Sequence, residues 1–369
     1  MIIKDEIYGT IQCSELEERI IDSEEFQRLH RIKQMAFTYL VYPSATHTRF
    51  EHCLGTMHLA STIAEKIGFN GEQLEKIRLF ALVHDIGHVA FSHESEYVLK
   101  QFLGDHEEIG RKKIMKGELC DILSENFSPK ELLDIEGRPE GKIITSDLGA
   151  DRMDYLIRDA RNTGVAYGII DVDRIVHTLS MEKNELAIDE SSLNAAESLL
   201  IARFMMFSTV YLHRTVRIAA AMLRKGILMA IESKTIKAGD FLNAGDEEIL
   251  LKMQVGDNKY ANALLKRKLY KEVLSIEPDE KIKKNIGKLE EEWSEKLKTD
   301  IIIDYPPVFS RPANFKVKTK SGLKLITELS DLVRVLETSE QKRKRILILC
   351  PAEDKEKIKN KITTSDFTL

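Results

Sequence analysis

The sequence predicts a mainly α-helical protein, and three observations support this fold class. Apolar residues recur at helical spacing through most of the first 235 residues, beginning with SELEERIIDSEEFQRLHRIKQM (14–35). The 369 residues are 43% hydrophobic and 31% charged, which is the composition of a large globular protein. Strand-like runs are confined to one short hairpin and the C-terminal third. We therefore expect a large helical domain over residues 1–235 and a smaller α+β region over residues 236–369.

Breaker residues divide the N-terminal domain into successive helices. Asp22 or Ser23 caps a second helix within the first segment, and Pro43 lies in a loop that follows it. The further expected helices are 50–67, 71–86, 93–103, 106–116, 118–126, 148–162, 191–213 and 214–233.

Short alternating runs predict the strands. The segment RIVHTLSMEKNELAIDE (174–190) has one such run on each side of a polar turn at Lys183-Asn184, which predicts a β-hairpin. In the C-terminal region, the expected strands are 270–276, 300–306, 315–320 and 345–351, and a charged amphipathic helix is expected at 278–297.

Composition argues against several classes of protein. The four cysteines are scattered, without a C-x-x-C pair, so we expect neither a zinc ribbon nor a disulfide framework. A reducing compartment is the simplest setting for such cysteines, so we expect a cytoplasmic protein. The most apolar region, 199–231, is interrupted by arginines, a lysine and a histidine, so we expect no membrane span there. A net charge of −5 does not indicate a stable nucleic-acid partner.

The segment LVHDIGHVAFSHE (82–94) concentrates three histidines and an aspartate. Histidine is a common ligand for transition metals, and carboxylates can complete the shell. Because the adjacent His84 and Asp85 supply only two ligands, His52 and Asp151 on other predicted helices are candidates for the same ion. A buried, hydrogen-bonded histidine is the competing interpretation, and the residues alone leave it open.

Four motifs resemble one enzyme family: HTRFEH (47–52), LVHDIGHVAFSHE, DHEEIG (105–110) and DLGADRMDYLIRD (147–159). Together they resemble the HD-domain phosphohydrolase superfamily, and within it the dNTP triphosphohydrolase branch that includes the sterile-alpha-motif and HD-domain protein of animal cells. The resemblance covers roughly residues 1–235 and implies a multi-helical HD-domain core.

The resemblance implies a divalent metal and a set of catalytic groups. The implied metal ligands are His52, His84, Asp85 and Asp151. Mixed nitrogen and oxygen ligation suits Fe, Mn, Ni, Co or Zn, and Mg is a further candidate. The implied catalytic groups are His93 as the acid for the leaving oxygen, Glu96 as its orienting partner, and His88, His106 and Arg49 at the phosphates.

The resemblance also implies contacts with a nucleotide substrate, although a salt bridge or core contact competes at each position. The implied substrate residues are Gln34, Met35, Arg152, Tyr155, Asp159, His213 and Arg217. Two positions depart from the family pattern, because a tyrosine is replaced by Arg217 and an arginine by Thr209.

Assembly and activation are a further implication. The branch generally forms homo-oligomers, so a dimer or tetramer is expected. Asp22 and Gln27 match residues of the family's nucleotide-activator site, but His30 stands where an arginine is expected.

The leading functional hypothesis is metal-dependent hydrolysis of dNTP to deoxynucleoside and inorganic triphosphate. One alternative is an HD-type phosphomonoesterase, phosphodiesterase or nuclease acting on another nucleotide. A second alternative is a nucleotide-binding regulator that has lost turnover.

Overall fold

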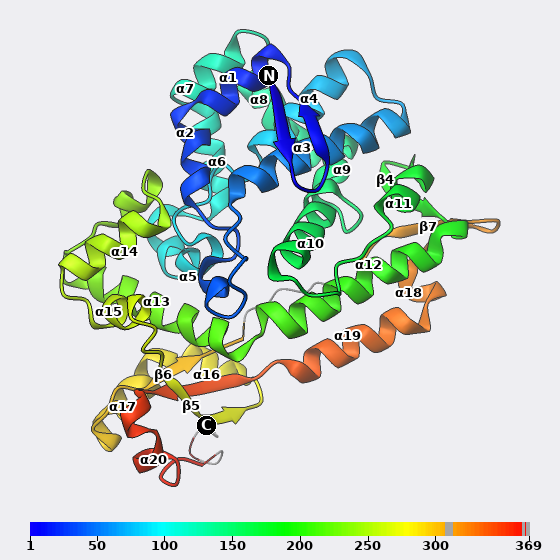
Figure 1. Cartoon of the computed structure of the whole chain (residues 1–369). Coiled ribbons are helices and arrows are strands. Elements are labelled where there is room, and N and C mark those ends of the chain that lie inside the picture. The colour runs from blue at the N-terminus through cyan, green and yellow to red at the C-terminus, as the bar shows by residue number, and fades with distance from the viewer. Residues whose placement is uncertain (307–312, 364–365, 367–369) are drawn as a thin grey trace.

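The computed structural model describes residues 1–306, 313–363 and 366, and it confirms the predicted mainly α-helical class (Figure 1). The strands are β1 (Ile2–Asp5), β2 (Gly9–Gln12), β3 (Leu179–Glu182), β4 (Glu185–Asp189), β5 (Lys271–Ile276), β6 (Ile302–Asp304), β7 (Lys316–Thr319), β8 (Gly322–Leu325) and β9 (Ile346–Cys350). Within the described residues they form three small sheets, ordered β1-β2, β3-β4-β7-β8 and β5-β9-β6. The hairpin β1-β2 was not predicted, because four-residue strands are too short to show a clear period.

The helices expected between residues 50 and 233 are present, with end shifts of up to three residues except for the expected helix 191–213, whose α-helical part ends at Met206. The helices are α1 (Glu15–Asp22), α2 (Glu24–Gln27), α3 (Arg49–Ile67), α4 (Gly71–Val83), α5 (Ser92–Leu103), α6 (His106–Met115), α7 (Glu118–Ser124), α8 (Pro129–Asp134), α9 (Lys142–Thr145), α10 (Ala150–Thr163), α11 (Val172–Thr178), α12 (Leu193–Met206), α13 (Arg214–Glu232), α14 (Asp246–Val255), α15 (Lys259–Leu265), α16 (Glu280–Lys284), α17 (Ile286–Leu297), α18 (Ile326–Leu329), α19 (Asp331–Arg343) and α20 (Lys355–Ile358). Because α4 ends at Val83, His84 and Asp85 lie in the turn just beyond it.

Helix α3 is the centre of the N-terminal core and packs against both α4 and α10 (Figure 1). Most of its residues are buried, so it lacks the polar face of a surface helix. Gly55 lies where α10 crosses α3, and a Cβ there would overlap Asp154 Oδ1 and Arg158 Nη2. The absent side chain therefore lets the two helices approach closely enough for buried polar groups to meet.

The hairpin predicted within residues 174–190 is confirmed as β3-β4, with its turn at Lys183 and Asn184, but residues 174–178 of the first predicted run belong to helix α11 instead. Both turn residues have positive φ, 52° and 66°, as a tight hairpin turn requires. Strand β4 also pairs in parallel with β7, so the C-terminal chain returns to the N-terminal half. Phe315 and Val317 accordingly belong to the N-terminal core.

The other C-terminal strands form a separate antiparallel sheet with β9 at its centre, and every residue of β9 is buried. Helix α13 contacts both β6 and α15, so contacts connect the two sides of residue 235. The domain boundary there stays a prediction. Among the described residues, no single helix is long and apolar enough to cross a membrane; 190–211 and 214–232 meet that criterion only as a pair bent by 63°.

The connection between α12 and α13 is a π-helical turn, Phe207–Tyr211. The sequence predicted two helices meeting at residue 213 and gave no sign of this wider turn. It changes which side chains of the segment face each side, because a π turn inserts a residue into the α-helical pattern.

We expect Gly55→Ala to lower the free energy of unfolding. Alanine usually favours a helix over glycine by about 1 kcal/mol, but here its methyl group would collide with a buried ion pair. Overpacking of this kind costs about 1–3 kcal/mol. Urea unfolding measures the change. The matched control is Gly287→Ala in α17, where nothing lies within 4 Å, and equal stability changes in the two variants would contradict the close-approach argument.

Candidate active site

Four side chains from three elements converge where the sequence predicts a metal site. His52 lies in the first half of α3, Asp151 in the first turn of α10, and His84 and Asp85 follow α4. His52 Nε2 is 3.1 Å from Asp151 Oδ1 and 3.7 Å from Asp85 Oδ2. His84 Nε2 is 3.8 Å from Asp151 Oδ1 and 3.5 Å from Asp85 Oδ1. Ligands about 2.0–2.2 Å from one ion lie at such separations from each other.

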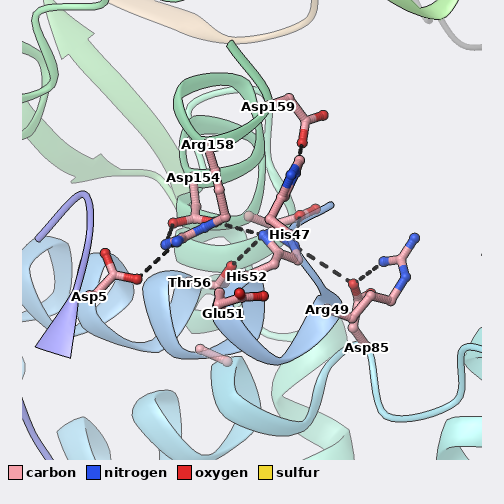
Figure 2. Close-up of polar contacts among 12 residues, drawn as sticks. Asp5, His47, Arg49, Glu51, His52, Thr56, Asp85, Asp154, Arg158 and Asp159 are labelled. Atoms are coloured by element: carbon pink, nitrogen blue, oxygen red, sulfur yellow. Dashed lines mark hydrogen bonds and ion pairs between the residues drawn. The ribbon is translucent and has the colours of Figure 1, made fainter. Parts of the chain in front are cut away.

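Partners behind the two histidines fix their orientation. His52 Nδ1 is 2.7 Å from Asp154 Oδ2 (Figure 2), and His84 Nδ1 is 2.7 Å from the carbonyl oxygen of Ala81. Both contacts suit Nδ1–H as the donor, which turns each Nε2 lone pair toward the carboxylates. Within the described residues, the buried His84 Nε2 has no hydrogen-bond partner. An orphaned nitrogen beside two carboxylates fits a divalent metal ion.

The cluster attracts positive charge. Burial disfavours a charged His52, but hydrogen bonds to Asp151 and Asp154 outweigh burial and raise its pKa to about 10. Asp85 is buried too, yet His84 and Arg49 hold its pKa well below the usual range. Arg49 Nη1 forms an ion pair with Asp85, as Figure 2 shows. The same field that favours a proton on His52 favours a metal cation in its place.

Three further histidines form a second cluster beside the first. The rings of His88 and His106 are stacked with centroids 4.1 Å apart, and the ring of His93 is 4.7 Å from His88 and 5.2 Å from His106. Glu96, predicted to orient His93, instead accepts a hydrogen bond from His106 Nδ1 at 2.7 Å. The reason is helical geometry, because Glu96 on α5 faces the first turn of α6.

This contact separates the pKa values of the three imidazoles. Burial, with the positive charge of Arg49 and His106 nearby, lowers the pKa of His93 to about 4. Burial and Arg49 also hold the pKa of His88 well below 6.5. Burial acts on His106 as well, but Glu96 outweighs it and raises the pKa of His106. Of these three imidazoles, His106 is therefore the one whose surroundings favour the protonated form.

Both clusters open into one cavity of about 340 Å³. It is lined on one side by metal-site and histidine-cluster residues and on the other by aromatic and aliphatic side chains. The predicted site residues that line it are Gln34, Met35, Arg49, His52, Asp85, His88, His93, His106, Asp151, Tyr155 and Asp159. A pocket that is polar at one end and apolar at the other suits a molecule with an anionic and an aromatic part.

Three predicted substrate residues are not brought to this cavity. Arg152 forms an ion pair with Asp147. Arg217 is buried and pairs with Asp304 at 2.6 Å. Together with His213, Arg217 lines a different cavity. Both residues follow the π-helical turn Phe207–Tyr211, and their implied substrate contacts stay predictions.

Several residues that shape the site were missed. Asp159 is held on both oxygens, by His47 Nε2 at 2.7 Å (Figure 2) and by the Tyr211 hydroxyl at 2.7 Å. His47 opens the HTRFEH motif, but its contact with Asp159, like that of Tyr211, has no local signal because the partners lie far apart in the sequence. Asp154 could have been found, since it stands one helical turn after Asp151.

We expect Glu96→Gln to lower the pKa of His106, because the neutral amide no longer stabilises the imidazolium. NMR titration of the His106 ring proton measures this pKa directly. The matched control is Glu107→Gln, which removes an exposed carboxylate next to His106. An unchanged His106 pKa in Glu96→Gln would contradict the assigned contact.

Known families account for most of the chain. The HD domain family matches residues 49–159, and the HD-associated region matches residues 170–367. An uncharacterised protein of Methanocaldococcus jannaschii is 42% identical over 97% of this chain and 80% of its own length. The deoxynucleoside triphosphate triphosphohydrolase SAMHD1 homologue of Dictyostelium discoideum is 27% identical, over 77% of this chain and 58% of its own length.

Two solved structures share the fold. A hypothetical protein from Aquifex aeolicus is 33% identical, with a TM-score of 0.83 over 98% of this chain and 100% of its own. A phosphohydrolase from Bacteroides thetaiotaomicron is 26% identical, with a TM-score of 0.78 over 95% of this chain and 99% of its own. Because the family matches extend over most of the sequence and a 42%-identical relative spans nearly all of it, the chain belongs to the HD-domain superfamily of phosphohydrolases.

Proposed function

We propose that the protein hydrolyses dNTP to a deoxynucleoside and inorganic triphosphate. The observation that carries this proposal is the shared cavity, in which a metal-ligand cluster and three histidines face an apolar nucleotide-sized space. The similarity to the Dictyostelium triphosphohydrolase adds support for this substrate class. The two clusters supply what phosphoester hydrolysis needs, namely charge neutralisation and proton transfer.

In this proposal His52, His84, Asp85 and Asp151 hold a divalent metal. The metal would supply Lewis-acid stabilisation of the phosphate charge and a more acidic water. Arg49 contributes a guanidinium at the cavity wall, held by Ser92 Oγ at 2.7 Å from its Nε. Its fixed position suits a phosphate oxygen, because guanidinium groups recognise such anions through paired N–H donors.

The reaction breaks the bond between the α-phosphorus and the 5′ oxygen. A water oxygen attacks phosphorus and releases a proton to solvent, and the leaving 5′ oxygen takes a proton from an imidazole. His93 stays our proposed acid, with His88 and His106 at the phosphates. A bound phosphate chain would raise the pKa of His93 by bringing negative charge beside it. The Glu96–His106 pair holds a proton nearby and could replenish it.

The opposite part of the cavity suits the nucleoside. Tyr155, Met35 and Gln34 line it, and Asp159 is fixed there by two hydrogen bonds. A carboxylate held in this fixed position is suited to orienting a polar group that lies next to the sugar ring. The metal identity, the preferred base, the homo-oligomeric state and the nucleotide activator stay predictions.

A second candidate, hydrolysis of a different nucleotide phosphoester, is favoured by one observation. His213 and Arg217, implied to contact the dNTP, lie outside the cavity. A substrate in the active-site cavity would therefore meet only four of the seven substrate residues that the resemblance implies, namely Gln34, Met35, Tyr155 and Asp159.

Product analysis separates the two candidates. Purified protein is incubated with Mn²⁺, Mg²⁺, Co²⁺ or Ni²⁺ and each of four dNTPs and four rNTPs, singly and mixed. We expect deoxynucleoside and intact triphosphate on ion-exchange chromatography. Orthophosphate as the first product would support the second candidate instead. Activity only in mixtures would additionally reveal a nucleotide activator.

We expect Asp85→Ala and Asp85→Asn to reduce turnover at least 1,000-fold, because a metal ligand and the partner of Arg49 are lost. The asparagine variant keeps the side-chain shape, so it separates chemistry from folding. Asp121→Ala, which removes an exposed carboxylate from α7, is the control. Full activity of metal-replete Asp85→Asn would refute the proposed role.

A further inference from the structure

We propose that Asp246 is a positioning residue of the active site, whose carboxylate holds two segments of the cavity wall at a fixed separation. We call residues 33–37 the first wall segment and residues 91–93 the second wall segment. Asp246 is buried and is the first residue of α14, outside the matched HD domain and outside every motif that resembles the family. Its role rests on the proposed hydrolysis, because it concerns the shape of the cavity in which that reaction would occur.

The two carboxylate oxygens of Asp246 accept one backbone hydrogen bond from each wall segment. Oδ1 accepts from the N–H of Phe91 at 2.7 Å, and Oδ2 accepts from the N–H of Lys33 at 3.0 Å. Burial raises the pKa of Asp246 to about 6 against the opposing effect of these two donors, so both oxygens can accept hydrogen bonds at neutral pH. Loss of the carboxylate would leave one buried and one partly buried N–H without this partner, which is costly.

The second wall segment has a backbone conformation that needs such support. Phe91 and Ser92 both have positive φ, 63° and 50°, which is unfavourable for residues other than glycine. A backbone of this kind persists only where surrounding contacts hold it. In this conformation Ser92 Oγ accepts a hydrogen bond from Arg49 Nε at 2.7 Å, and His93, the proposed acid, lines the cavity. The Asp246 contact therefore stabilises the arrangement that places both groups.

The first wall segment shapes the part of the cavity that we assign to the nucleoside. Gln34 and Met35 follow Lys33 directly and line the cavity. The ring of Phe37 stacks on the ring of Phe91, with centroids 5.5 Å apart, so the two wall segments also meet through their side chains. A single carboxylate thus connects residues at the phosphate end of the cavity with residues at its nucleoside end.

The start of α14 is built for a close approach to the first wall segment. A Cβ on Gly245 would lie 2.4 Å from the Cβ of Arg31 and 2.8 Å from its carbonyl oxygen, so only glycine fits there without a shift. The neighbouring Glu247 meets the Lys33 ammonium at 3.3 Å, but this glutamate side chain is 83% exposed and water screens the pair. The buried contact that fixes the approach is therefore that of Asp246.

Two substitutions of Asp246 and two matched controls test the proposal in the full, metal-loaded chain. Asp246→Ala removes both acceptors, whereas Asp246→Asn keeps the side-chain shape but directs an amide N–H₂ toward one of the two N–H donors. The first control, Glu247→Gln, removes the adjacent exposed carboxylate. The second control, Met253→Ala, removes a buried side chain that packs from α14 against Gly226 of α13, so it lowers stability without touching either wall segment.

Steady-state kinetics are measured at a temperature where circular dichroism shows every variant to be folded. We expect Asp246→Ala to lower kcat at least 30-fold and Asp246→Asn at least fivefold. KM should change less than fivefold, because the metal ligands and most of the cavity wall stay in place. Both controls should keep kcat within threefold of the wild type. An equal loss of kcat in Met253→Ala, or an effect of Asp246→Ala on KM alone, would overturn the proposal.

A double-mutant cycle identifies the route of the effect. If Asp246 acts through the second wall segment, its replacement should matter less once the Ser92 hydroxyl that supports Arg49 is gone, since groups that act as a unit are not additive. We expect the loss of kcat from Asp246→Ala to be at least threefold smaller in a Ser92→Ala background. Equal factors in the two backgrounds would contradict this route.

Hydrogen exchange tests the contact without any substrate. In Asp246→Ala, the amides of Lys33 and Phe91 should exchange at least tenfold faster than in the wild type, and in Glu247→Gln they should not. Unchanged exchange would overturn the proposal even if the protein hydrolysed no phosphoester. The kinetic assays use the phosphoester that product analysis identifies, so a substrate other than dNTP would count against the proposed function and not against the role of Asp246.

Discussion

The candidate site depends on one buried carboxylate, that of Asp154. It accepts the Nδ1–H of His52 and pairs with both Nε and Nη2 of Arg158, all away from solvent. Such a group is stable only because every partner is present, since a buried charge without partners costs several kcal/mol. Arg158 is in turn shared with Asp5 of the N-terminal hairpin (Figure 2). The orientation of a metal-site histidine thus depends on contacts among α3, α10 and the first strand.

Sequence reasoning succeeded where the signal is local. The candidate metal ligands stand in motifs whose order and spacing can be recognised in the sequence, and the helices beside them show clear apolar periodicity. It failed where long-range packing decides. Glu96 stands one turn after His93, yet its hydrogen bond goes to His106 on the next helix. His213 and Arg217 were assigned by resemblance, and in the structure they line another cavity, just after a π-helical turn for which the sequence gives no signal. No pattern in the sequence predicts the pairing of β4 with β7.

The histidine cluster shows how packing differentiates chemically identical groups. The three imidazole rings have centroids 4.1–5.2 Å apart and line the same cavity. Burial lowers the proton affinity of each, and a single carboxylate reverses this for one of them. The protein thereby places one imidazole with a raised pKa beside two with lowered pKa values, and such a separation lets neighbouring groups take different roles in proton transfer.

The parallel pairing of β4 with β7 has a consequence for how the chain reaches its final form. Residues 185–189 cannot pair with residues 316–319 until the latter have been synthesised. One edge of the hairpin β3-β4 therefore has no partner strand while the intervening chain is made. An open strand edge invites pairing with other chains, and contacts so distant in sequence form slowly. The order of synthesis therefore leaves the N-terminal half incomplete until the last quarter emerges from the ribosome. Aggregation during translation is the hazard that this architecture has to avoid.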